Sequence, residues 1–113
     1  MSKFDETLAQ YHAEMKKLGI KYDEALFHAV TKGLGPSIYL ADASKVSCSD
    51  SAELDRVKNN FLIKKLGMKD APALDDAIKG VCEKMGSANR NKFRAIFYYL
   101  LVEKLSKQSF YAK

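Results

Sequence analysis

Eight consecutive apolar residues, 95–102, constrain the fold of this chain more than any other stretch. A helix built from such a run has no polar face for water, and a helix that is apolar on all sides is usually buried at the centre of a bundle. The run is far shorter than the roughly 20 residues of a membrane-spanning helix, so no membrane span is expected. We predict a buried C-terminal helix whose core residues are Phe93, Ile96, Phe97, Leu100 and Leu101.

Apolar residues in the rest of the chain recur at intervals of three and four, the period of a helix with one buried face. Helices are expected over residues 4–18, 22–30, 54–61 and 74–85, and the glycines that follow can end them. No segment alternates apolar and polar residues as a half-buried strand does. The sequence therefore predicts an all-α fold, a compact single-domain bundle of five or six helices over residues 1–113.

Helix starts are also expected from the sequence. Asp23 is a candidate N-cap, and Asp50 with Glu53 has the spacing of a capping box, in which each side chain bonds a free amide at the helix start. Asp70 with Pro72 is expected to open the next helix. Ser87 is expected to cap the last and longest helix. Residues 37–49, rich in serine, predict an irregular connection with room for one helical turn.

The Gly-Leu-Gly-Pro stretch at residues 33–36 resembles a phosphate-binding loop at first sight. A Walker-type loop would end in Gly-Lys-Ser/Thr, and a dinucleotide fingerprint would need a third glycine where this chain has Ile38. We interpret the stretch as helix punctuation instead. Gly33 is expected to supply a left-handed cap, Gly35 a turn, and Pro36 the first residue of a helical turn.

Three strings in this sequence carry a resemblance to a known family. They are GLGPSIYLADASKV (33–46), NNFLIKKLGM (59–68) and NRNKFRAIFYYLLVEK (89–104). The chain resembles a family of short bacterial proteins known as domain of unknown function 2853, and the resemblance covers nearly its whole length. It implies a helical cytoplasmic protein, and it brings no activity, cofactor, partner or catalytic residue.

Few residues indicate a catalytic or metal-binding site. His12 and His28 are sixteen positions apart on different helices, with no other ligand at metal-binding spacing, so no metal, cofactor or catalytic residue is predicted. Cys48 and Cys82 match no zinc, haem or redox spacing, and we expect two reduced thiols. With no secretory signal visible, the expected location is cytoplasmic. Asp75, four residues before Lys79, is expected on a solvated face.

Charge is unevenly distributed along the chain. Residues 1–56 have seven basic and nine acidic side chains, a net charge of −2, whereas residues 57–113 have twelve and five, a net charge of +7. A basic surface of this kind suits an acidic protein, a small anion or a nucleic acid. The basic residues expected on that surface are Lys58, Lys64, Lys65, Lys69 and Lys92.

The expected start of the last helix, at residues 87–94, holds an electrostatic conflict. Cations are unfavourable beside free helix amides, and Arg90 and Arg94 would share one helical face. An acidic group would relieve both effects. It could be a carboxylate elsewhere in the chain, or an anion bound at Ser87, Arg90 and Arg94.

The sequence favours a non-enzymatic accessory or protein-interaction module. The alternatives are a basic nucleic-acid-binding module and, less favoured, a small enzyme with a site assembled in space.

Overall fold

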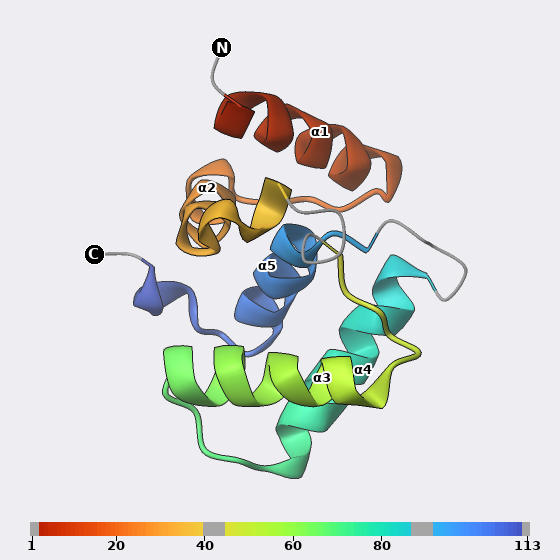
Figure 1. The fold of residues 1–113 in the computed structure, drawn as a ribbon, viewed down its shortest axis with the longest axis vertical. Coiled ribbons are helices and arrows are strands. Elements are labelled where there is room, and N and C mark those ends of the chain that lie inside the picture. The colour runs from red at the N-terminus through yellow and green to blue at the C-terminus, as the bar shows by residue number, and fades with distance from the viewer. Residues whose placement is uncertain (1–2, 40–44, 87–91, 112–113) are drawn as a thin grey trace.

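The computed structural model describes residues 3–39, 45–86 and 92–111 (Figure 1), and every regular element within these ranges is a helix. A π-helix, η2 (Val57–Lys65), directly follows the α-helix α3 (Ser51–Arg56). The chain also has two 3₁₀ helices, η1 (Gly35–Tyr39) and η3 (Gln108–Phe110), in its described part. The predicted all-α class with five or six helices is confirmed. The α-helices are α1 (Lys3–Lys17), α2 (Glu24–Gly33), α3 (Ser51–Arg56), α4 (Pro72–Met85) and α5 (Arg94–Lys104).

Helix α5 lies at the centre of the molecule, with α1 and α2 on one side and α3 with η2 on the other (Figure 1). It packs against α1, α2 and α4. All eight residues of the apolar run 95–102 are buried, and so are all five residues predicted for the centre of the core. The buried last helix is therefore confirmed. Its expected rank as the longest helix is wrong, because α5 has 11 residues and α1 has 15.

The start of α5 also differs from the prediction, because the helix begins at Arg94 rather than just after Ser87. Phe93 has extended backbone angles and forms an isolated antiparallel bridge with Lys45. The Val46 amide donates to the Lys92 carbonyl at 2.8 Å. This pairing with a distant segment holds residues 92 and 93 out of the helix. Ser87 and Arg90 lie outside the described residues.

Two of the three aspartates expected at helix starts, Asp23 and Asp50, cap a helix with their side chains. The Asp23 carboxylate accepts from the amides of Ala25 and Leu26, and the Asp50 carboxylate caps α3 in the same way, as expected. The reciprocal half of the capping box is wrong, because the Asp50 amide donates to Ser47 and the Glu53 carboxylate pairs with arginines. Asp70 is not a cap either. Ala71 precedes Pro72 at the start of α4, and the Asp70 carboxylate binds Lys58 instead.

The Gly-Leu-Gly-Pro stretch separates two helical segments, so its interpretation as punctuation is confirmed. Helix α2 ends at Gly33, Leu34 stays right-handed, and η1 begins at Gly35 with φ of +67°. The left-handed residue is therefore Gly35, and its assignment to Gly33 is wrong. Gly33 has another role, because a Cβ there would lie 2.8 Å from the Lys65 Nζ.

The π-helix η2 follows from the spacing of its apolar residues. Val57, Phe61, Leu62 and Leu66 are buried, at intervals of four, one and four. In a π-helix the amide of residue i+5 donates a hydrogen bond to the carbonyl of residue i, which widens the turn and brings these positions onto one side. The Leu66 amide, for example, donates to the Phe61 carbonyl at 2.9 Å. The Phe61 ring then stacks on Tyr98 of α5, with centroids 3.9 Å apart.

The two cysteines form a disulfide, so the expectation of two reduced thiols is wrong. Cys48, just before α3, is bonded to Cys82 of α4 with their Cα atoms 6.0 Å apart. Packing of η2, which continues α3, against α4 brings together two residues 34 positions apart, which no local spacing could reveal. A loop of this length stabilises a fold by about 4 kcal/mol in the chain-entropy model.

No helix within the described residues is long and apolar enough to cross a membrane.

The central position of α5 gives a first prediction. Leu101 is fully buried, so Leu101→Ala should lower the free energy of unfolding by about 2 to 5 kcal/mol, measured by urea denaturation. Lys64→Ala, at an exposed position, is the control and should change it by less than about 0.5 kcal/mol. Equal losses in the two variants would contradict the central role of this helix.

Candidate functional site

The acidic partner expected for Arg94 was either a carboxylate elsewhere in the chain or a bound anion, and the structure shows a carboxylate from within the chain. Its guanidinium pairs with the Glu53 carboxylate of α3 and donates to the Tyr98 hydroxyl at 2.8 Å. A longer contact, 3.5 Å, reaches the Lys45 carbonyl. This arrangement matches the alternative raised from the sequence, a carboxylate elsewhere in the chain. Helix α5 begins at Arg94, and the expected shared face with Arg90 lies outside the described residues.

Electrostatics at this pair favour the charged state of both groups. Burial would raise the pKa of Glu53, but hydrogen bonds and charges from Arg56 and Arg94 lower it overall. Burial would lower the pKa of Arg94, and Tyr98 and Glu53 raise it overall. The pair therefore links α3 to the first turn of α5 as an ion pair at neutral pH, and Arg94 has a structural role.

The five lysines of the predicted basic surface have different environments. Lys58 binds Asp70 at 2.9 Å and Asp75 at 3.3 Å, and these carboxylates raise its pKa. Asp75 is exposed, as expected, but its carboxylate pairs with Lys58 rather than with Lys79.

The other four lysines of the predicted basic surface are placed as follows. Lys65 donates to the Gly33 carbonyl at 3.0 Å, and burial lowers its pKa. Lys92 is only 7% exposed, so the prediction that it lies on the basic surface is wrong. Its carbonyl accepts from the Val46 amide, and this backbone pairing holds residue 92 against the core. Lys64 and Lys69 are exposed, as predicted.

The two histidines have different partners. His12 Nδ1 is hydrogen-bonded to the Tyr22 hydroxyl, and its ring packs against Phe27. His28 is exposed, with its ring edge against Phe4. Within the described ranges, no three histidine, cysteine or acidic side chains cluster as metal ligands do.

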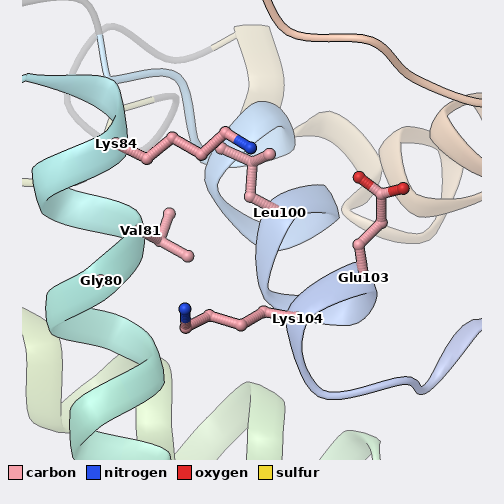
Figure 2. Close-up of a pocket in the computed structure, with 6 residues that line it drawn as sticks. All are labelled: Gly80, Val81, Lys84, Leu100, Glu103 and Lys104. Atoms are coloured by element: carbon pink, nitrogen blue, oxygen red, sulfur yellow. The ribbon is translucent and has the colours of Figure 1, made fainter.

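A candidate site is a half-open cavity of about 300 Å³ between α4 and α5. Figure 2 shows Lys84 and Lys104 reaching across it from opposite helices, with Val81 and Leu100 between them. In the described part of the chain, neither lysine has an ion-pair partner. Two cations and an apolar wall thus border one small space. Such a space can hold a carboxylate or phosphate with a short apolar part.

Two further residues define the shape and charge of this cavity. Gly80 lets the Lys104 side chain lie against α4, since a Cβ at this position would lie 3.0 Å from Lys104 Cε. Glu103 also lines the cavity, but its carboxylate points away from α4 (Figure 2). Burial and the nearby Glu103 raise the pKa of Tyr99 to about 12. The Glu103 carboxylate therefore lies next to a phenol that is neutral at pH 7.

Sequence reasoning missed this cavity, although one signal was present. Gly80 is an isolated glycine inside a helix, where it costs about 1 kcal/mol relative to alanine and usually has a packing or functional reason. Lys84 is one turn further along the same face. Lys104 is in another helix, and only the packing of α5 against α4 brings it to this face.

The fold and the cavity together define a small all-α protein with two lysines at an open site between adjacent helices. A family model described as protein of unknown function DUF2853 matches residues 10–109. The chain belongs to this family. No curated protein matches the chain.

The Glu53 and Arg94 pair gives a pH-dependent prediction. The lowered pKa of Glu53 means that its stabilisation is present above the unfolded-state pKa of about 4.3 and is lost as pH falls through the folded-state value. Glu53→Gln should therefore lower the free energy of unfolding by about 1 to 3 kcal/mol at pH 7, with a smaller loss near pH 3.

Urea denaturation of the wild type and the variant across this pH range measures the difference. Glu83→Gln, at an exposed position of α4, is the matched control and should show little loss at any pH. A loss for Glu53→Gln that does not shrink in acid would rule out the ion pair as its cause.

Proposed function

We propose that this protein is a non-enzymatic accessory protein that binds an acidic ligand in the cavity between α4 and α5. The observation that supports the proposal is that Lys84 and Lys104 line one cavity from opposite helices, with no ion-pair partner for either in the described residues. Lysine amines without carboxylate partners attract anions without first giving up an internal contact. Val81 and Leu100 would contact the apolar part of such a ligand.

The size of the cavity favours a small acidic group. A volume of about 300 Å³ is at the lower end of ligand pockets, so it suits a small organic anion or one acidic side chain of a protein partner. Both sources supply the same group, a carboxylate or phosphate that would lie beside a lysine ammonium group of this cavity. Binding of this kind requires no reacting residue, which is why the proposal is non-enzymatic. The expected cytoplasmic location also stays a proposal, although it can no longer be argued from reduced thiols.

The nucleic-acid alternative has less support. It depended on the +7 charge of residues 57–113, yet Lys58 and Lys65 make contacts within the chain and Lys92 is buried. It is kept as an outcome of the binding experiment.

The proposal predicts binding that depends on two lysines. Isothermal titration calorimetry with succinate, inorganic phosphate, a glutamate-rich peptide and duplex DNA would compare the sources of the acidic group. Lys84→Gln combined with Lys104→Gln should weaken the binding of one of the first three probes at least tenfold, about 1.4 kcal/mol, since both cations at the cavity are removed.

The matched control is Lys64→Gln with Lys69→Gln, which removes the same charge from exposed positions and should change affinity less than twofold. An equal loss in both double variants would indicate a general charge effect and contradict the cavity. Binding of duplex DNA alone, with a steep salt dependence, would favour the nucleic-acid alternative.

Gly80 provides a second test, in which stability and binding should move in opposite directions. Gly80→Ala should raise the free energy of unfolding by up to about 1 kcal/mol, because alanine is the better helix former. The added Cβ would displace the Lys104 amine, so binding of the same probe should fall several-fold. Unchanged affinity in this variant would show that ligand binding does not depend on the position of the Lys104 side chain against Gly80.

A further inference from the structure

The Cys48–Cys82 disulfide lines a second half-open cavity of about 290 Å³. Both cysteines are half-buried, so the bond lies at the edge of the core rather than inside it. At about 100° per residue, the α4 residues of this cavity, Ile78 and Cys82 among them, lie on the face opposite Gly80 and Lys84. The second cavity is therefore separate from the one proposed above.

The accessibility of a disulfide decides how it reacts. An attacking thiolate must approach a sulfur, and a disulfide enclosed in a core is reached only after unfolding. Here the two cysteines form part of the wall of an open space large enough for a small organic molecule. The apolar side chains Leu54 and Ile78 form another part of that wall.

We propose that this cavity is a thiol–disulfide exchange site for a low-molecular-weight thiol. The thiolate attacks one cysteine sulfur, the protein S–S bond breaks, and its electron pair leaves on the other sulfur, which takes up a proton. This forms a mixed disulfide. A second thiolate attacks the small-molecule sulfur of the mixed disulfide and releases the remaining cysteine thiolate, which is also protonated. In total, two thiols are oxidised to one small disulfide and the protein disulfide is reduced to two thiols.

The charges around the cavity indicate the class of thiol. Lys79 and Asp55 line it from α4 and α3, and neither has an ion-pair partner among the described residues. Asp75 also lines it, but Lys58 binds that carboxylate. One uncompensated cation and one uncompensated anion suit a thiol that carries both a carboxylate and an ammonium group. An amino-acid thiol such as cysteine has this chemistry, and its short carbon chain would contact Leu54 and Ile78.

The experiment measures how fast the full chain loses its disulfide in native buffer with increasing cysteine or 2-mercaptoethanol. Samples are quenched by alkylation and analysed by mass spectrometry, and rates are divided by the thiolate concentration. The rate should rise in proportion to thiol without a plateau, and a mixed disulfide should be seen. Cysteine should react several-fold faster than 2-mercaptoethanol, which has neither charge.

Charge variants test the recognition step. Lys79→Gln should remove the advantage of cysteine while leaving the rate with 2-mercaptoethanol within twofold, and Lys64→Gln should leave both rates unchanged. A plateau at the independently measured unfolding rate would overturn the proposal, since the sulfurs would then be reached only in the unfolded chain. Equal rates for both thiols in the wild type would overturn the assignment of an amino-acid thiol. Neither result depends on whether the cavity between α4 and α5 binds an anion.

Discussion

Burial of α5 on every side is the interaction on which the rest of the structure depends. Its side chains leave water only if other helices surround it, so α1, α2, η2 and α4 each direct apolar residues toward it. Loss of apolar surface from water is the main favourable term in folding, and all eight residues of the run 95–102 contribute to it. The ion pair between Glu53 and Arg94 and the stacking of Phe61 on Tyr98 then fix how α3 and η2 meet it.

The parts of the fold that depend on local patterns could be predicted from the sequence. The apolar run gave the central helix, and Asp23 and Asp50 cap the helices expected of them, because a cap involves only the next three residues. Gly33 was expected to end α2 with a positive φ, but the positive φ is at Gly35, and Gly33 instead leaves room for Lys65. Hydrophobic spacing also predicted a helix at η2, without revealing its wider turn.

The ion pair, the disulfide, the late start of α5 and the cavity depend on residues far apart in the chain, which sequence reasoning could not bring together. Arg94 and Glu53 are 41 positions apart, and the two cysteines 34. The bridge between Lys45 and Phe93 delays the start of α5 and buries Lys92, which composition alone placed on a basic surface. The cavity between α4 and α5 needs lysines from both helices, so a net charge of +7 could suggest an anionic ligand but could not locate it.

The position of the central helix in the chain has a consequence for biosynthesis. Helices α1 to α4 all precede α5, so the ribosome makes their apolar faces before it makes the surface that covers them. Stepwise folding of the growing chain would leave each of these faces exposed to water and to other chains. Folding should therefore begin only after α5 has emerged, as one cooperative event rather than helix by helix. Until then the nascent chain is a natural substrate for chaperones that bind exposed apolar segments.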